Sequence, residues 1–328
     1  MVRSVTVCRR IGVLAALVAL AGTSCAAPAT DRPHDGAVIA ILRAVPGVSS
    51  TVPAFLDELR SAGFTVGGDL VVLGADPDEA YPDDESARQA VREWRAGGVD
   101  LIVAFSTAGA RIATETAPDV DVLFLSNDPV AAGLVGNADR PEARATGVTF
   151  RVPADRTLDL ARRAVPGLDL VGIATAGDAA ADAHAAAIFE AADALGVGVV
   201  VEEFDEEIGP AVSRLAERGV DALLLSNSPG ATSALAETED AAAKAGLPLI
   251  SNSPLAESAV VSLAPDVAEI GRQLARQAAR LLSGSGVVAV PVEDPRRFVT
   301  TVNPSAAAGF GIELPDELLR EADRVAEG

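Results

Sequence analysis

From about residue 37 onward, the sequence alternates short apolar runs with longer amphipathic stretches, and this alternation constrains the fold more than any other feature. Short runs rich in Val, Ile and Leu are typical of buried strands, and apolar residues that recur every three or four positions are typical of helices. The pattern indicates βαβ units around parallel sheets. The expected strands are residues 38–42, 70–73, 101–105, 122–125, 170–174, 197–202, 222–225, 247–250, 259–263 and 298–302. The expected helices are residues 52–62, 86–96, 154–164, 179–195, 210–218, 231–245, 267–283 and 314–326.

An internal similarity indicates that the pattern occurs twice. Residues 98–106 read Gly-Val-Asp-Leu-Ile-Val-Ala-Phe-Ser, and residues 219–226 read Gly-Val-Asp-Ala-Leu-Leu-Leu-Ser. The strands that follow end in Ser-Asn-Asp-Pro at 126–129 and in Ser-Asn-Ser-Pro at 251–254. Gene duplication explains this similarity, and so does independent use of the same strand-to-loop residues in a chain rich in Ala and Val. We expect an α/β protein with two Rossmann-like lobes, each built on a parallel sheet.

The charge and the scarcity of thiols and imidazoles exclude several classes of protein. The 328 residues include 26 Lys and Arg against 47 Asp and Glu, a net charge of −21, and Lys244 is the only lysine. Such a surface repels nucleic-acid phosphates and anionic lipid headgroups, so we expect no nucleic-acid partner. Because Cys8 and Cys25 are the only cysteines, the body has no disulfide framework, Cys-rich metal site or cysteine nucleophile. His34 and His184 are too few for a multi-histidine metal site, so we expect neither a metal ion nor a cofactor.

The first 24 residues have the features of an export signal. Three arginines precede an uncharged apolar run at 11–21, which has about the length of a signal-peptide core and is short for a membrane span. The small residues Gly-Thr-Ser then precede Cys25, as in a bacterial lipoprotein signal, whose cysteine is lipidated and becomes the mature N-terminus. A plain secretory signal is the alternative, because Gly stands where lipoprotein signals usually have Leu. Residues 25–36, rich in Pro, Ala and Asp, are expected to form a flexible tether.

Polar residues collect where the expected strands end. The tetrapeptide Ser-Asn-x-Pro begins at Ser126, Ser226 and Ser251, and each copy follows an apolar strand. In an open parallel sheet, ligands bind outside the carboxyl ends of the strands, where helix N-termini present free N–H groups. Helix capping is the alternative explanation at each position, because Ser, Asn and Asp are the usual caps. The candidate ligand-binding residues are Arg43, Ser106, Thr107, Asn127, Asp128, Thr175, Asn227, Ser228, Asn252 and Ser253.

Six further segments are distinctive as a set. They read Asp-Leu-Ile-Val-Ala-Phe-Ser-Thr at 100–107, Asn-Asp-Pro-Val-Ala-Ala-Gly-Leu-Val at 127–135, Ala-Thr-Gly-Val at 145–148, Ile-Gly-Arg-Gln at 270–273, Val-Asn-Pro-Ser-Ala-Ala-Ala at 302–308 and Ile-Glu-Leu-Pro-Asp-Glu-Leu-Leu at 312–319. Together they resemble the type I periplasmic binding proteins of ABC importers, specifically the lipoprotein group that includes tryptophan- and tyrosine-binding components. The resemblance covers residues 37–327.

This resemblance implies a type I periplasmic binding protein architecture, also called a Venus flytrap, in which the chain crosses three times between two lobes. The crossings are expected near residues 146–152, 261–265 and 292–298. Residues 1–24 would be the signal peptide and 25–36 the tether. Lobe 1 would comprise residues 37–147 plus 266–292, and lobe 2 residues 148–264 plus 293–328.

Departures from the family pattern bear on the ligand. Acidic or amide residues that the resemblance implies after three strands of the second lobe are replaced by Ser228-Pro229, Ser253 and Thr175-Ala176. Acids at such positions would pair with a ligand ammonium, so their loss argues against a simple α-amino-acid ligand. Asp128 remains a candidate for an ammonium and Arg43 for a carboxylate. Phe105 and Phe124 are candidates for stacking on a ring, with a place in the core as the alternative.

An enzyme has less support in the sequence. Residues 42–47, after the first strand, lack the spaced glycines that a dinucleotide needs, and there is no Gly-x-x-x-x-Gly-Lys loop. A serine hydrolase needs an accessible base, but His34 lies in the tether and His184 is expected on a helix surface. The contiguous acids at 83–85 and 202–207 are typical of solvated loops rather than of cation sites. We therefore expect a protein without catalytic activity.

The expected function is that of an extracytoplasmic solute-binding component of an ABC importer. The chain would capture a small molecule, such as an amino acid or a related metabolite, between its lobes and deliver it to a permease with a cytoplasmic ATPase. We expect a monomer that is anchored to the cell membrane through lipidated Cys25. The alternative is a sensory or signalling lipoprotein of the same fold, which would present its ligand-bound form to a membrane receptor.

Overall fold

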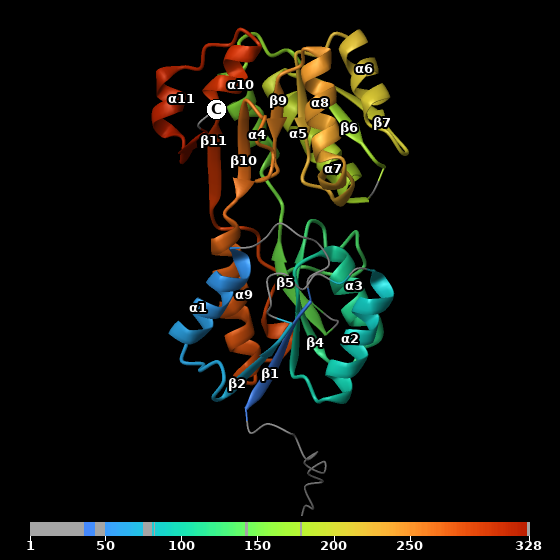
Figure 1. Ribbon diagram of the computed structural model, residues 1–328, viewed down its shortest axis with the longest axis vertical. Coiled ribbons are helices and arrows are strands. Elements are labelled where there is room, and N and C mark those ends of the chain that lie inside the picture. Colours follow the sequence, from blue (N-terminus) through green and yellow to red (C-terminus); the bar gives the residue numbers. More distant parts are fainter. Residues whose placement is uncertain are drawn as a thin grey trace, which may run out of the picture. The chain divides into compact units, whose positions relative to one another are not determined.

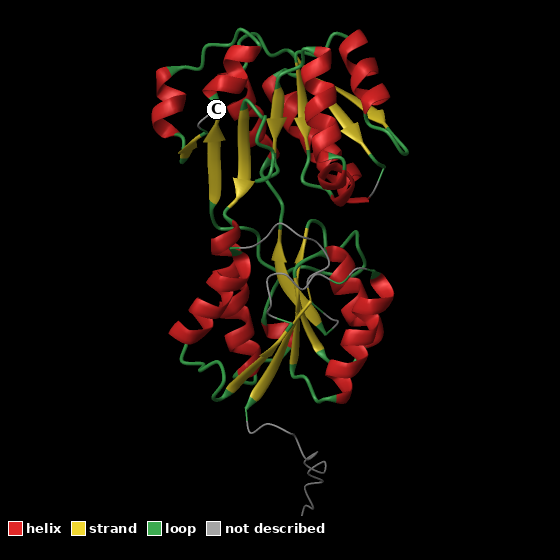
Figure 2. Ribbon diagram, viewed as in Figure 1, coloured by secondary structure: helices red, strands yellow, loops and turns green. Residues whose placement is uncertain are grey.

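The computed structural model describes residues 36–42, 50–74, 81, 83–141, 144–177 and 179–326. Arg43, Cys25 and His34 lie outside the described residues, as do the expected signal peptide and all of the expected tether except Gly36. Within the described residues, no helix combines the length and the apolar character that crossing a bilayer requires. Strands and helices alternate in two lobes, each with a central sheet between helices (Figure 1, Figure 2).

Lobe 1 is built on a five-stranded parallel sheet with the order β2-β1-β3-β4-β5. Its strands are β1 (Ala37–Leu42), β2 (Leu70–Leu73), β3 (Leu101–Ala104), β4 (Asp121–Ser126) and β5 (Ala145–Thr149). One face is covered by α1 (Thr51–Ser61) and α9 (Val267–Leu282), and the other by α2 (Asp84–Ala96) and α3 (Thr107–Thr116) (Figure 1). Coverage on both faces explains why the strands are nearly continuous apolar runs rather than alternating ones.

The only tryptophan of the chain lies in this lobe, on α2. Trp94 packs edge-on against Tyr81, with ring centroids 6.1 Å apart, beside the apolar cluster beneath α2 and α3. Both rings are therefore part of the packing of lobe 1.

Lobe 2 is built on a seven-stranded sheet with the order β12-β11-β10-β9-β8-β6-β7, in which β11 runs antiparallel to β10 and the other pairs are parallel. Its strands are β6 (Leu170–Thr175), β7 (Gly198–Glu203), β8 (Ala222–Leu225), β9 (Leu249–Ser251), β10 (Val261–Pro265), β11 (Phe298–Val302) and β12 (Arg324–Val325). One face packs against α4 (Ala154–Ala164), α5 (Ala179–Leu195), α10 (Pro304–Gly309) and α11 (Asp316–Glu321). The other packs against α6 (Gly209–Glu217), α7 (Pro229–Ser233) and α8 (Leu235–Ala245).

The expected α/β fold with two parallel-sheet lobes is confirmed, and the main differences from the expected elements concern residues 145–149, 231–245 and 314–326. Residues 145–149, expected to lie in a crossing, form β5 and pair with β4. Thr146, Val148 and Thr149 favour a strand, but Gly147 and the polar threonines interrupt the apolar run by which the other strands were predicted. The expected helix 231–245 is two helices, α7 and α8, separated at Ala234. The expected helix 314–326 ends at Glu321 and is followed by β12.

The chain passes between the lobes three times. It leaves β5 for α4 through residues 150–153, leaves β10 for α9 at Asp266, and returns from the 3₁₀ helix η1 (Val287–Ala289) to β11 through residues 290–297. Asp266 caps α9 by accepting the N–H groups of Ala268 and Glu269, at 3.0 and 3.1 Å. The second crossing is therefore a sharp turn, because Asp266 directly follows β10 and is also the N-cap of α9.

Two buried glutamines, one turn apart on α9, hold the third crossing against β5. The Nε2 of Gln277 donates to the carbonyls of Gly147, at 3.1 Å, and of Pro291, at 3.2 Å. The Oε1 of Gln273 accepts the N–H of Arg296 at 3.1 Å. These bonds attach most of the third crossing to lobe 1. Few of its residues are therefore left to change conformation if one lobe moves relative to the other.

Gly147 lies where β5 is most tightly packed. A Cβ at this position would lie 2.0 Å from the carbonyl oxygen and 2.7 Å from the nitrogen of Phe124 on β4. The Gly147 carbonyl also accepts the N–H of Glu293 at 2.9 Å, in addition to its bond with Gln277. Glycine is required here by the close approach of neighbouring main chains rather than by an unusual φ.

We expect Gly147→Ala to lower the free energy of unfolding by about 2 kcal/mol or more, because the added methyl group must push β5 away from β4. Urea denaturation followed by circular dichroism measures this. Gly136→Ala is the matched control, since a Cβ at Gly136 meets no atom within 4 Å. Equal unfolding midpoints for the two variants would contradict the packing argument.

Candidate functional site

The carboxyl ends of β3 and β4 bring three hydroxyl groups together in lobe 1. Ser106 caps α3, because its Oγ accepts the N–H of Gly109 at 3.0 Å. The Oγ1 of Thr107, the first residue of α3, lies 2.9 Å from the Oγ of Ser126 in a hydrogen bond. Ser126 is buried, whereas Ser106 and Thr107 are partly exposed. Thr107 therefore presents a hydroxyl at the positive end of α3, where a polar or anionic group is favoured.

A chain of hydrogen bonds, the asparagine relay, connects the strand ends of the two lobes. The Nδ2 of Asn127, after β4, donates to the main-chain oxygen of Asn227 at 2.7 Å and to its Oδ1 at 3.2 Å. The Nδ2 of Asn227, after β8, donates to the carbonyl of Phe150 in the first crossing at 2.6 Å. The N–H of Phe150 donates back to Ser126 at 3.0 Å. The structure thus brings two of the predicted residues, one from each lobe, into direct contact.

Asp128 has a capping role, with one oxygen directed towards an arginine. Its Oδ1 accepts the N–H groups of Val130 and Ala131, at 3.1 and 2.9 Å, and its Oδ2 lies 3.9 Å from the guanidinium of Arg151. Arg151 follows Phe150 in the first crossing and also lies 3.8 Å from Asp294. Sequence reasoning missed Arg151, although it follows an apolar run just as Arg43 does.

The predicted hydroxyl groups of lobe 2 form hydrogen bonds with nearby main-chain groups. Thr175, Ser228 and Ser253 are nearly fully buried, with 4%, 2% and 3% of their surface exposed. Each side-chain oxygen accepts a main-chain N–H from two or three residues later in the chain, at 3.2–3.3 Å. For these three residues the capping explanation describes the contacts in the structure.

Asn252 was expected at an accessible strand end, but the structure places it in the interior of lobe 2, with no exposed surface. Its Nδ2 donates to the Oγ1 of Thr157 and to the carbonyl of Leu263, both at 3.0 Å. Its Oδ1 lies 2.9 Å from the Nε2 of His184. All of its hydrogen-bonding groups thus tie together α4, α5, β9 and β10, which leaves none for a ligand.

His184 is a partner of this network rather than the helix-surface residue that was expected. Because the carbonyl of Leu263 can only accept, the amide nitrogen of Asn252 faces it, and the Oδ1 of Asn252 accepts a hydrogen bond from the Nε2–H of His184. The Nδ1 of the neutral ring is buried and has no hydrogen-bond partner. Burial lowers the pKa of His184 below its usual value of 6.5, and the bond with Asn252 offsets this only in part.

Of the remaining candidates, two phenylalanines lie in the core and one arginine lies outside the described residues. Phe105 and Phe124 are buried, and Phe105 packs edge-on against Phe55 with ring centroids 6.3 Å apart, so both belong to the core of lobe 1. Arg43 lies outside the described residues. Among the residues that are described, no three or more His, Cys, Asp or Glu side chains are grouped as a metal ion would need.

We expect the stability of the protein to fall as the pH decreases below about 6.5, through the ordinary pKa of an unfolded histidine. A lowered pKa in the folded state means that the unfolded chain binds the proton first, so acid favours unfolding. His184→Gln, which keeps an N–H for Asn252 but does not titrate, should reduce this loss. Urea denaturation of both proteins from pH 5 to pH 7.5 tests it, and parallel pH profiles would show that His184 contributes nothing.

Solved structures with a similar fold come from several bacteria. A conserved domain protein from Vibrio cholerae has a TM-score of 0.77 and 23% identity, over 88% of this chain and 99% of that one. An ABC domain from Streptococcus pneumoniae, solved in complex with L-Trp, has a TM-score of 0.77 and 20% identity, over 89% and 100%. A ligand-free, open substrate-binding protein with adhesive properties from Clostridium difficile has a TM-score of 0.72 and 22% identity, over 89% and 99%. These likenesses support the type I periplasmic binding protein fold.

Two comparisons at the level of sequence give matches, one over part of this chain and one over most of it. The tyrosine-binding protein of Clostridioides difficile is 25% identical over 129 residues, which are 39% of this chain and 36% of that protein. The chain therefore matches only about a third of the length of this curated relative. The family described as ABC transporter substrate binding protein matches residues 37–326, which include nearly all of the described residues. The resemblance seen in the motifs is confirmed: the chain belongs to the ABC transporter substrate binding protein family.

Proposed function

We propose that this protein is the extracytoplasmic solute-binding component of an ABC importer, and that it holds a small molecule between the carboxyl ends of its two sheets. Family membership supports the class of function. The observation that carries the site is the asparagine relay, in which Asn127 of lobe 1 donates to Asn227 of lobe 2. Polar groups from both lobes are thus within reach of one ligand, which is what closure around a solute requires.

The ligand's polar end is assigned to lobe 1. Ser106, Thr107 and Asn127 are partly exposed there, and the N-terminus of α3 favours a carboxylate or another electron-rich group. An ammonium would have Asp128 as its nearest acid, but that carboxylate already caps a turn and lies near Arg151. The ligand class is therefore an amino acid or a related small carboxylate, in which the carboxylate contributes more than the ammonium.

The protein would deliver this solute to a permease with a cytoplasmic ATPase. We assign it no catalytic step, and we propose that it acts as a monomer. The lobes would close on the ligand because some contacts form only when both lobes touch it, so the ligand shifts the population towards the closed form. Lipidated Cys25 would keep the protein at the outer side of the cell membrane.

A thermal-shift screen of amino acids, nucleosides, sugars and small carboxylates tests the proposal. A ligand that binds only the folded state at about 100 times its Kd adds about 2.7 kcal/mol of stability, which raises the melting temperature measurably. L-Tryptophan, L-tyrosine and their des-amino carboxylates form the first set, because these compounds separate the contribution of the ammonium from that of the carboxylate. No shift with any compound would count against a solute-binding role.

With a ligand found in that screen, Thr107→Val should weaken binding about tenfold, since it removes one hydroxyl contact without changing the shape of the side chain. Thr114→Val is the matched control on the same helix, because the Oγ1 of Thr114 bonds to carbonyls of its own helix, at 3.0 and 3.1 Å. Isothermal titration calorimetry gives both dissociation constants. Equal affinities for the two variants would place the ligand away from α3.

We expect Cys25→Ser to abolish incorporation of a clickable fatty acid into the protein in bacterial cells, because the thioether would form on this thiol. Cys8→Ser is the control, since Cys8 lies within the segment that export removes. Gel fluorescence of the purified chain measures the label. Label retained in Cys25→Ser would overturn the lipid anchor while leaving the solute-binding proposal untouched.

A further inference from the structure

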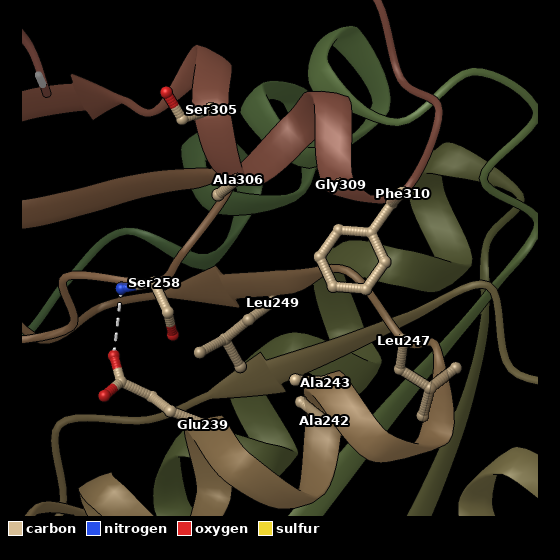
Figure 3. A pocket seen from close by; sticks show the side chains of 10 residues that line it. All are labelled: Glu239, Ala242, Ala243, Leu247, Leu249, Ser258, Ser305, Ala306, Gly309 and Phe310. Atoms are coloured by element: carbon tan, nitrogen blue, oxygen red, sulfur yellow. Dashed lines mark hydrogen bonds between the residues drawn. The ribbon is translucent and has the colours of Figure 1, made fainter. Parts of the chain in front are cut away.

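Lobe 2 has a cavity at the amino end of β9, which we call the α8–α10 cavity. It has a volume of about 290 Å³ and lies between α8, the start of β9, and α10 (Figure 3). Buried side chains of Ala242, Leu247 and Leu249 line it, and the partly buried ring of Phe310 stands across from them (Figure 3). An apolar, concave surface with an aromatic wall is suited to the hydrocarbon part of a small ligand.

One side chain gives the cavity a charge. Glu239 on α8 is the only charged residue among those that line it. Its Oε1 accepts the N–H of Ser258 at 3.0 Å. The ion pairs found within the described residues do not include Glu239, and the one lysine, Lys244, pairs instead with the neighbouring Asp240 outside the cavity. A carboxylate with no cation beside an apolar pocket favours a ligand that brings its own positive charge.

The two ends of the cavity differ in chemistry. Figure 3 shows Glu239 and Ser258 at one end, with Phe310 and Leu247 at the other. We propose that the α8–α10 cavity binds a small primary amine with an apolar or aromatic body. The ammonium donates to Glu239 and to the Oγ of Ser258, and the body packs between Phe310 and the leucines of the opposite wall.

This site is separate from the proposed solute site. Leu247 and Leu249 lie at the amino end of β9, and Ser258 precedes β10, whereas Asn227 and Asn252 follow the carboxyl ends of β8 and β9. The inference therefore does not depend on the proposed function, and a substitution at the asparagine relay should leave amine binding intact.

The test uses the full chain and 2-phenylethylammonium as the probe, with 2-phenylethanol as its uncharged analogue. Chemical-shift changes in ¹H–¹⁵N spectra should saturate, centre on residues of α8 and α10, and give a Kd at least about tenfold lower for the amine than for the alcohol. Asn227→Ala should bind the amine as the wild type does, which distinguishes this cavity from the solute site.

Two variants test the assigned contacts. Glu239→Gln keeps an oxygen for the N–H of Ser258 but removes the charge, and should weaken amine binding about tenfold, as should Phe310→Ala by removing the aromatic wall. Asp240→Asn makes the same chemical change on the same helix outside the cavity and should have no effect. Matching circular dichroism spectra and melting temperatures confirm that the variants are folded. Absence of saturable binding, equal binding by Glu239→Gln, or shifts centred elsewhere would overturn the proposal.

Discussion

The bond between Asn127 and Asn227 is a weak contact between two rigid parts, and the proposed mechanism depends on that contrast. Within each lobe, parallel strands are held by continuous main-chain bonding and by helices on both faces. A single amide-to-carbonyl hydrogen bond contributes only about 0.5–1.5 kcal/mol net. A small ligand that contacts both lobes can supply a comparable or larger difference in free energy. Ligand binding can therefore supply enough free energy to change how the lobes are arranged, but not enough to change the fold of either lobe.

The two lobes use the same motif differently. In lobe 1 Ser106, Thr107 and Asn127, which follow β3 and β4, remain partly exposed, although each already makes a hydrogen bond within the protein. In lobe 2 the corresponding polar residues are buried, and Asn252 is committed to a network with His184 and Thr157. Such a network fixes the positions of α4 and α5 beneath the strand ends. Lobe 1 thus supplies most of the partly exposed polar groups, and lobe 2 supplies a rigid surface with the partly exposed side chain of Asn227.

The fold could be predicted from the sequence because its strands are buried on both faces and its helices are amphipathic. β5 was missed because its glycine and threonines interrupt the apolar run by which the other strands were predicted. At the candidate site, the positions of the strand ends were predictable, and Asn127 and Asn227 do meet. The sequence did not predict which of these residues turn into the core. Asn252 is buried because it contacts residues distant in the sequence, and Arg151 lies near Asp128 because of the path that the first crossing takes.

The placement of two rare residues has a practical consequence for watching this molecule move. Trp94 is the only indole and lies on α2 of lobe 1, while Lys244 is the only lysine and lies on the last turn of α8 in lobe 2. Lys244 is well exposed, with 75% of its side chain accessible. An amine-reactive acceptor dye attached there would form an energy-transfer pair with the native tryptophan. The chain thus carries one donor and one lysine in different lobes, so their separation can be followed without any substitution once the α-amino group at the N-terminus is blocked.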